Sequence, residues 1–302
     1  MSTIVTNTIP KAQRPGVNKF FGLYDKHPDF TKEMYEYNTS NLGYEEEVLV
    51  SGSGLATVKG EGDSVNFDTI TQGYTQRYSH VVYGIAYSIT EEAVEDGKFL
   101  PMIQRVIKHG TKSMDTTKQV VGANPYNRAF NSSYTYGDGK ELIATDHPSK
   151  AGTWQNEPTN SSDFSEASLE DMCILIGKMT DDAGNEIAIR PRKLIGGVDL
   201  EFDFCRVLKS LQRTNTANND INAIKEMGRI PDGYITNPFI TSAKSFFLRT
   251  DATDGLKAFM RRPRKFSKDG DFTTENGLYK FTERYSFGAT DPRGIVGNPG
   301  AS

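Results

Sequence analysis

The sequence has 302 residues but only two cysteines, Cys173 and Cys205. They are far apart and lie among apolar residues, so they indicate buried thiols in a reducing compartment rather than a disulfide framework. Histidine is scarce as well, and the four histidines share no metal-ligand spacing and no nucleophile partner. They are His27, His80, His109 and His147. We therefore expect structural or exposed histidines and no metal site.

Motifs for enzyme chemistry are also missing. The sequence contains no phosphate-binding P-loop and no G-x-S-x-G elbow. Gly52–Thr57 resembles half of a dinucleotide fingerprint, but the third glycine is absent and β-type residues follow where a helix should begin. The carboxylates of Asp199, Glu201 and Asp203 alternate with apolar residues and are best explained as the acidic first turn of a helix. We predict a non-enzymatic protein without a cofactor.

Long hydrophobic runs and an excess of positive charge are absent too. No run approaches the 18 apolar residues of a membrane span, and the N-terminus lacks a signal-peptide core, so we expect a soluble protein made in the cytoplasm. The net charge of −4 excludes a general attraction to nucleic acid or an anionic membrane. Hydrophobic residues make up 36% of the chain, a low share that fits extended arms around a modest core.

The most prominent positive feature is a helical run from Thr90 to about Asn131. Gly97 interrupts this run, and Pro101 restarts it at a first-turn position where a missing N–H costs nothing. The segment from Pro101 to Asn124 would be roughly 36 Å long. Its apolar face recurs at steps of three and four. The face consists of Ile103, Val106, Gly110, Met114, Thr117 and Val121. No catalytic set lies on the polar side, so the pattern predicts a structural strut.

The residues before the helix predict an N-terminal arm followed by a β-ribbon. Residues 1–45 are rich in aromatic residues, which argues against simple disorder, and a short helix is predicted from Pro28 to Tyr37. Residues 46–89 contain β-rich runs punctuated by glycine and aspartate, including Val81–Ile85, and predict a long two-stranded excursion. An isolated ribbon is marginal in water, so this one should lean on a partner surface, and its edges invite pairing.

The residues after the long helix predict an α/β block over about 131–250. A hairpin is expected with its turn at Asp181–Asn185 and its returning strand at Ile187–Ile195. The remaining predicted elements are three helices, at Ser165–Lys178, Leu200–Leu211 and Ile221–Met227, and a strand at Tyr234–Ile240.

The last block predicts strands at Ser245–Arg249, Lys257–Arg262 and Leu278–Phe287. The third strand alternates apolar and polar residues, as half-buried antiparallel strands do. Arg261–Lys265 is the one dense charge cluster. It would bind phosphates or acidic partners, or more simply form salt bridges with nearby carboxylates, some of them between subunits. The carboxylates considered are Asp251, Asp254, Asp269 and Asp271.

A set of longer runs between about residues 80 and 295 carries a family resemblance. The runs are Tyr83–Ala93, Ala188–Ile195, Pro231–Pro238, Phe247–Ala252, Asp271–Asn276, Thr282–Gly288 and Thr290–Gly294. In order and spacing they resemble the major head (capsid) subunits of tailed phages of the Mu-like kind. The resemblance implies an α+β Hong Kong 97-type capsid fold. It divides the chain into an N-terminal arm (1–45), an extended β-ribbon loop (46–84), a peripheral domain with the spine helix (85–131), an α/β axial domain (132–250) and C-terminal strands that return to the peripheral domain (251–302).

The resemblance also implies a function. The chain would be a structural protein that assembles as hexamers and pentamers into the icosahedral head shell of the virion, around double-stranded DNA. Its partners would be further copies of itself, scaffold, portal and decoration proteins, and DNA through weak non-specific contact, with no membrane. We place inter-subunit contacts at Lys59, Arg261, Arg262, Arg264 and Arg284.

Some capsid relatives link a loop lysine to an asparagine of another subunit, and Lys59 is the only lysine of this loop. A lone lysine is weak support, so we predict no isopeptide bonds. The alternative functions are a tail-tube or decoration protein, which would form tubes or bind shells, and a cytosolic α/β enzyme that uses the carboxylates near Asp199. An enzyme would need a pocket with converging titratable groups.

Overall fold

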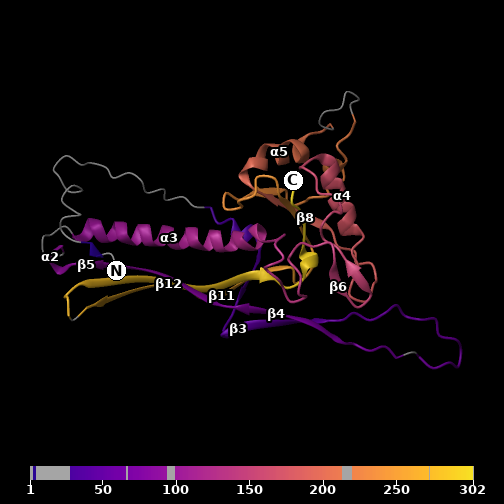
Figure 1. Cartoon of the computed structure of the whole chain (residues 1–302), viewed down its shortest axis with the longest axis horizontal. Helices are drawn as coiled ribbons and strands as arrows, with labels where there is room; N and C mark the ends of the chain where they lie inside the picture. Colours follow the sequence, from indigo (N-terminus) through magenta and orange to yellow (C-terminus); the bar gives the residue numbers. More distant parts are fainter. Residues whose placement is uncertain are drawn as a thin grey trace.

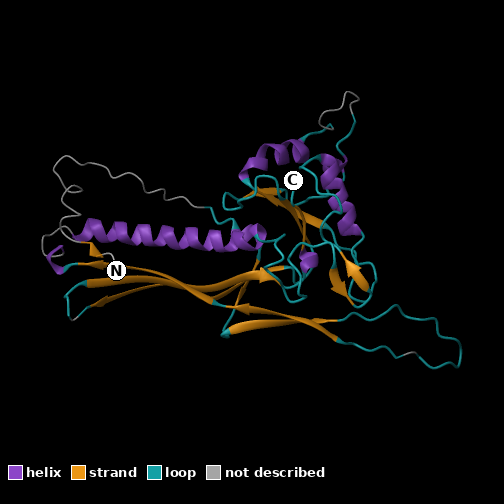
Figure 2. Cartoon of the chain, in the orientation of Figure 1, coloured by secondary structure: helices purple, strands orange, loops and turns teal. Residues whose placement is uncertain are grey.

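The computed structural model describes residues 3–4, 28–65, 67–93, 99–212, 220–271 and 273–301. These residues form a long helix-and-sheet arm, a more compact body at one end of it, and a thin hairpin that projects past the body (Figure 1). Several sheets and a few helices occur in separate layers rather than in a regular βαβ alternation (Figure 2). The predicted α+β class is therefore confirmed.

Helix α3, Phe99–Asn127, is the longest helix, at 29 residues or about 43 Å. It runs along one face of the arm's sheet (Figure 1). The predicted strut is confirmed, but it ends at Asn127 instead of continuing toward Asn131, and a turn follows at residues 128–130. Before it, α2 is a short turn, Glu91–Ala93. Gly97, where an interruption was predicted, lies outside the described residues.

The arm's sheet has five strands in the order β1-β5-β12-β11-β2. The central strands β5 (Val81–Ile89), β12 (Gly277–Ala289) and β11 (Leu256–Gly270) are antiparallel neighbours. The short strands β1 (Thr3–Ile4) and β2 (Glu36–Thr39) pair in parallel at the two edges. The strand predicted at Lys257–Arg262 is thus longer than expected and continues past two bulges.

The face of β12 toward α3 is mainly apolar, as the alternation predicted. Phe281 and Tyr285 are buried there. Gly110 of α3 lies directly over Phe281, where a Cβ atom would come within 2.5 Å of the ring, so glycine allows the helix to approach the sheet closely. Glu283 lies on the same buried face. Its charge was not anticipated in this apolar stripe.

The predicted helix Pro28–Tyr37 is wrong at both ends, before Thr31 and after Met34. Only α1, Thr31–Met34, is helical, and Tyr35 takes an extended conformation with φ −127° and ψ 154°. The chain then continues as β2 because its backbone pairs with β11. A non-local pairing partner has overridden the local helical pattern.

The predicted ribbon is formed by β3 (Tyr44–Val50) and β4 (Gln72–Ser79), which pair only with each other in the described structure. Residues 51–65 and 67–71 between them belong to no strand, and Glu61 and Gly62 form a turn. Val81–Ile85, also expected in the excursion, instead belongs to β5 of the arm's sheet. The change occurs at His80, where the chain leaves the ribbon and begins to pair with β12.

The body is built on a four-stranded sheet in the order β13-β10-β8-β9. Its strands are β13 (Ile295–Asn298), β10 (Phe246–Thr250), β8 (Pro191–Gly196) and β9 (Tyr234–Thr236), and a small hairpin, β6 (His147–Ser149) and β7 (Gly152–Trp154), lies beside it. Its helices are α4 (Glu166–Gly177), the 3₁₀ turn η4 (Val198–Leu200), α5 (Glu201–Lys209), α6 (Ala223–Glu226) and the 3₁₀ turn η5 (Pro292–Gly294).

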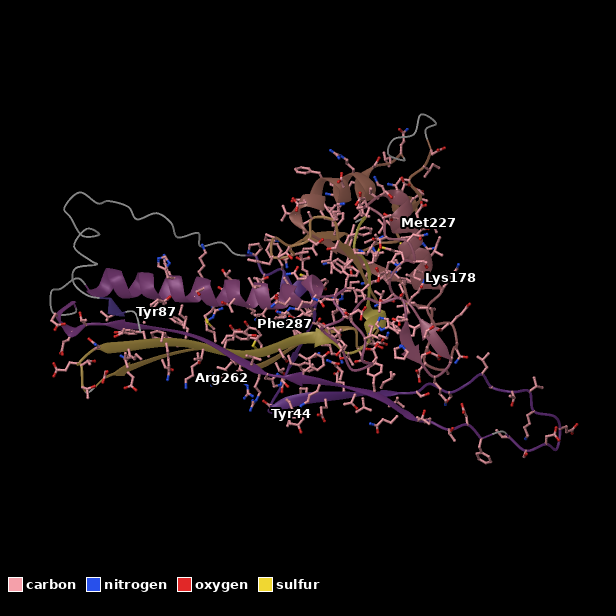
Figure 3. All side chains as sticks on the ribbon, in the orientation of Figure 1. Tyr44, Tyr87, Lys178, Met227, Arg262 and Phe287 are labelled. Atoms are coloured by element: carbon pink, nitrogen blue, oxygen red, sulfur yellow. The ribbon has the colours of Figure 1, made fainter. Side chains whose placement is uncertain are left out.

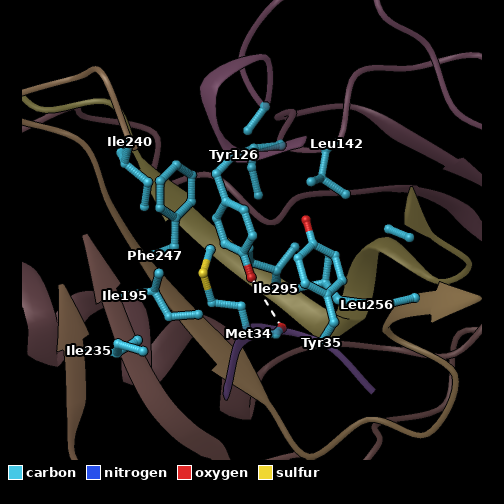
Figure 4. Packing of buried hydrophobic residues seen from close by; sticks show 14 residues of the cluster. Met34, Tyr35, Tyr126, Leu142, Ile195, Ile235, Ile240, Phe247, Leu256 and Ile295 are labelled. Atoms are coloured by element: carbon cyan, nitrogen blue, oxygen red, sulfur yellow. Dashed lines mark hydrogen bonds between the residues drawn. The ribbon is translucent and has the colours of Figure 1, made fainter. Parts of the chain in front are cut away.

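The two faces of this sheet belong to different cores. Phe246 and Leu248 of β10 pack with residues of α4 and α5, whereas Phe247 packs with Tyr126 at the end of α3 and with Met34. Tyr126 and Phe247 meet edge to face at 5.2 Å, and the Tyr126 hydroxyl donates to the Met34 carbonyl oxygen (Figure 4). The second core therefore joins the arm to the body.

Three predicted elements of the body need correction. The strand expected at Ile187–Ile195 begins only at Pro191 and pairs with β10 and β9, so the hairpin reduces to the turn and a single bridge between Thr180 and Glu186. The predicted helix to Leu211 ends at Lys209, and the strand to Ile240 ends at Thr236. In each case long-range pairing or packing set a boundary that the local sequence left open.

Candidate inter-subunit surfaces

The loop of residues 51–71 exposes large apolar side chains at the tip of the β3–β4 hairpin. Val58 and Phe67 are 100% and 99% exposed, and Leu55 is 82% exposed. Lys59, one of the predicted contact residues, is exposed in the same loop. Monomeric proteins rarely leave such side chains clustered in water, so this loop has the properties of an interaction surface.

The base of the same hairpin is firmly attached to the subunit. Lys257 Nζ donates to Glu47 Oε1 and to Asp254 Oδ1, each at 2.6 Å. Burial opposes the charge of Lys257, but the hydrogen bonds to Asp254 and Glu47 outweigh it and raise the pKa of the amine. The hydroxyl groups of Tyr78 and Thr290 also bond, at 2.6 Å. The loop thus projects from a fixed root.

The face of the arm's sheet away from α3 carries a group of cations. In the strand register Arg262 lies opposite Arg284, Lys265 opposite Thr282, and Lys280 opposite Ser267. Figure 3 shows Arg262 on this face and Phe287 between the sheet and α3. Arg262, Lys265 and Lys280 form no ion pair with the described residues. We refer to Arg262, Lys265, Lys280 and Arg284 as the basic face.

Arg284 belongs to the basic face but is held in place by the backbone. Its guanidinium donates to the carbonyl oxygens of His80 and Gly43, both at 3.2 Å. Arg261 makes one long bond, 3.5 Å, to the Ser40 carbonyl oxygen. All five predicted contact residues are exposed or half-buried. Lys59 lies in the loop 51–71, whereas the four arginines lie on β11 and β12 of the arm's sheet.

Arg264 points to the opposite side, beneath α3. The bulges of β11 around Pro263 shift its alternation, so that Arg264 pairs with Asp115 of α3 and lies 3.8 Å from Glu283. Lys118 approaches Glu283 at 3.4 Å. This group replaces the salt bridges predicted for the cluster, because the expected carboxylates have other partners. Asp254 binds Lys257, Asp251 accepts from the Arg190 amide, and Asp269 and Asp271 accept bonds within their own turn.

Two of the candidate histidines, His80 and His147, lie in hydrogen-bond networks within the fold. The imidazole of His80 lies between Ser286 and Ser40, and burial together with Arg284 and Arg261 lowers its pKa. His147 is fully buried and bonds Asp138 at 2.6 Å and Asn156 at 3.0 Å. Cys173 and Cys205 are free thiols. His109 is exposed, and His27 lies outside the described residues.

The described residues contain no group of three or more histidine, cysteine or acidic side chains placed to hold a metal. Glu201 and Asp203 occupy the first turn of α5, as predicted, and Asp203 pairs with Arg206. Across the same described ranges no helix has both the length and the apolar composition of a membrane span.

A family model for phage capsid proteins matches residues 73–298, which include the three central strands of the arm's sheet, α3 and nearly all of the body. The chain belongs to the phage capsid protein family. A comparison with curated protein sequences finds no match. Solved structures are similar over nearly the whole of this capsid protein, although sequence identity is very low.

Three of these structures illustrate the likeness. The capsid of an empty GTA particle is 11% identical and covers 100% of both chains, with a TM-score of 0.56. A structure from Mycobacterium phage Adephagia is 9% identical and covers 100% of this chain and 99% of its own, with a TM-score of 0.53. The SrpI encapsulin of Synechococcus elongatus is 8% identical and covers 91% and 88%, with a TM-score of 0.54. The predicted Hong Kong 97-type fold is confirmed.

The capsid protein is therefore a structural subunit of a phage shell, and the virion is its location. Sequence reasoning identified the exposed loop and part of the basic face. It missed the ion pair between Glu47 and Lys257 at the base of the β3–β4 hairpin, and the ion pairs of Glu283. The alternating pattern of β12 contained a signal for the second, since an acidic residue stood in its apolar row.

Proposed function

We propose that this capsid protein assembles as hexamers and pentamers into an icosahedral head shell that encloses double-stranded DNA. The observation that carries the proposal is the loop 51–71, whose apolar side chains have no cover within the described subunit. Fully burying one such side chain contributes about 1.5–3 kcal/mol. Several burials per subunit, repeated around a closed shell, would stabilise the assembly strongly.

In this proposal the chain retains the five parts expected from its sequence. Residues 1–45 would be the N-terminal arm and 46–84 the extended loop, except that Val81–Gly84 pair in β5 of the arm's sheet. Residues 85–131 would be the spine region, 132–250 the axial domain and 251–302 the returning strands, except that β13 pairs with β10 in the body sheet. The long α3, the projecting hairpin and the separate body sheet support this division. The loop would overlap a neighbouring subunit while the body gathers near the symmetry axis.

Charge complementarity supports a contact between loop and sheet. The loop carries Glu61, Asp63 and Asp68 against the single cation Lys59. The basic face carries cations without carboxylate partners among the described residues. We propose Arg262 and Arg284 as contacts for an acidic neighbour, with Lys59 and Arg261 at the margin. Arg264 would act indirectly, because its guanidinium is already held beneath α3.

The remaining partners follow from the shell. A separate scaffold protein would guide assembly, a portal would occupy one vertex, decoration proteins would bind outside, and DNA would contact the wall weakly. The subunit would be made in the host cytoplasm. We propose that it is not an enzyme and that subunits are not joined by isopeptide bonds. Boiled, reduced shells should then run as single subunits on denaturing gels, and ladders of linked subunits would contradict this.

The test is electron microscopy of the purified protein together with its mass from light scattering. Closed shells, or discrete pentamers and hexamers, are expected, with or without a co-expressed scaffold. Helical tubes would favour the tail-tube alternative. A 33.5 kDa monomer at every concentration, with scaffold present, would contradict the proposal.

A further inference from the structure

The arm's sheet leaves one edge of β5 without a partner. On that side β1 pairs only with Ser88 and Ile89, the last two of the nine residues of β5. Within the described ranges, no strand pairs with this edge at residues 81–87. The pairing with β1 demonstrates that the edge accepts an added strand.

The exposed edge of β11 on the other side of the sheet is different. Beyond β2 it carries Pro263, two bulges and a series of cations, which are features that hinder pairing with another strand. Residues 81–87 of β5 contain no charge and no proline, and Val81 and Val82 are 50% and 53% exposed. An uncharged edge without proline favours pairing with a further chain.

The loop contains a segment whose length and residue types suit pairing with this edge of β5. Residues 64–70 equal residues 81–87 in length and include Val65, Phe67, Thr69 and Ile70, all residue types that are enriched in strands. Within the described part of the chain they form no backbone–backbone hydrogen bond. Val65 and Ile70 are 64% and 70% exposed. Both segments thus present backbone groups without a strand partner among the described residues, together with exposed apolar side chains.

We propose that residues 64–70 of a second copy of this chain add as a strand to the free edge of β5. This inference rests on the proposed shell function and specifies one contact within it. The loop and the free β5 edge lie toward opposite ends of the subunit, so a subunit does not supply its own partner strand (Figure 1). The contact is heterologous, and contacts of this type close into rings when the rotation between subunits permits.

Charge also favours this occupant. Lys280 lies opposite Ala86 and Arg284 opposite Val82 on the neighbouring strand β12. Lys280 is exposed, and the residue opposite it on β5 is the small Ala86. Asp68 of the added segment brings a carboxylate whose pKa is lowered by hydrogen bonds from the Gly54 and Thr69 amides, so it is charged at neutral pH. Pairing would satisfy backbone groups, and the ions would favour the register.

Hydrogen exchange measured by mass spectrometry on assembled shells and on unassembled full-length protein tests the contact. Amides in 81–87 and in 64–70 should both exchange at least about tenfold more slowly in shells, since strand pairing protects the amides that face the partner. Residues 257–260 of β11 serve as the reference, because they are already paired on both sides. Protection of only one of the two segments, or of neither, overturns the proposal.

A pair of matched loop variants tests the identity of the occupant. Val65→Pro disrupts the proposed strand, whereas Ala56→Pro places the same residue in the other limb of the loop. We expect V65P to reduce protection of 81–87 by at least about tenfold in shells, or to block assembly, and A56P to do neither. Equal behaviour of the two variants overturns the proposal.

The two proposals fail in different ways. Shells that form with an unprotected β5 edge overturn the strand contact and leave the shell function intact. Absence of shells even with scaffold overturns the shell function and the contact that rests on it.

Discussion

Large apolar side chains are buried in the core that joins the arm to the body. Side chains of the same kind are exposed in the loop 51–71. Phe247 and Tyr126 are fully enclosed by residues of their own chain, whereas Phe67 is 99% exposed. A subunit that folds alone can bury the first set, but the second set is uncovered in the described subunit. The comparison separates what stabilises the subunit from what is available for assembly.

The largest effect on subunit stability is expected in the buried core between the arm and the body. Phe247→Ala would leave a cavity between α3 and β10 and should cost about 3–5 kcal/mol of unfolding free energy. Phe202→Ala is the matched control, because Phe202 is 74% exposed. Thermal unfolding of unassembled protein checks both. Equal shifts in Tm would contradict the assignment of Phe247 to the core.

The buried ion pairs beneath α3 should give the next largest effect. Glu283→Gln removes the counter-charge of Lys118 and one of the two carboxylates near Arg264. Because both cations are mostly shielded from water, the change should cost about 2–3 kcal/mol, somewhat below the usual cost of breaking a fully buried pair. Glu46→Gln tests an exposed pair with Arg77 and should cost less than about 0.5 kcal/mol. Denaturant unfolding distinguishes the two, and a Glu283→Gln protein as stable as Glu46→Gln would refute the role of the pair.

A smaller, pH-dependent effect is expected at His80. Its pKa is lowered in the folded state, so the unfolded chain binds more protons below the ordinary histidine pKa of about 6.5. Stability should therefore fall as the pH drops from about 6.5 toward 5. His80→Gln should weaken this fall, and the exposed His109→Gln should not. Urea midpoints at pH 7.5 and pH 5.5 measure it, and an unchanged difference in His80→Gln would speak against His80.

The smallest effect on the stability of the isolated subunit is expected in the exposed loop 51–71. Phe67→Ala should change its unfolding free energy by less than about 0.5 kcal/mol, because surface substitutions away from specific contacts usually do. The same variant should assemble markedly less at equal concentration, as followed by light scattering. Wild-type assembly by Phe67→Ala would show that this side chain is not covered in the shell.

Local sequence patterns predicted those elements whose structure depends on local spacing. The apolar stripe from Ile103 to Val121 lies within α3, and the helix predicted at Ser165–Lys178 matches α4, which Ser165 caps through a reciprocal bond with Ser168. The alternation of apolar and polar residues predicted for the last strand is also present in β12. In these cases the periodic side chains and the caps act within one or two turns or strand residues, so the chain itself contains the required signal.

The candidate contact residues show where such prediction stops. The cluster Arg261–Lys265 was recognised, but its salt-bridge partners were sought nearby in sequence. Arg264 instead pairs with Asp115, because bulges around Pro263 turn it toward a helix far away in the chain. Lys257 likewise finds Glu47 across the root of the hairpin. Neither partner is visible from local spacing.

The sequence by itself determined that this is a capsid protein of the α+β, Hong Kong 97-type fold, with a long helix and a projecting ribbon. It did so because those features depend on residue order and on runs shared with a family. Only the tertiary structure decided which strands pair, which side of the sheet each charge occupies, and which strand edge stays open. Those outcomes depend on residues that are distant in the chain and meet only once the backbone has folded.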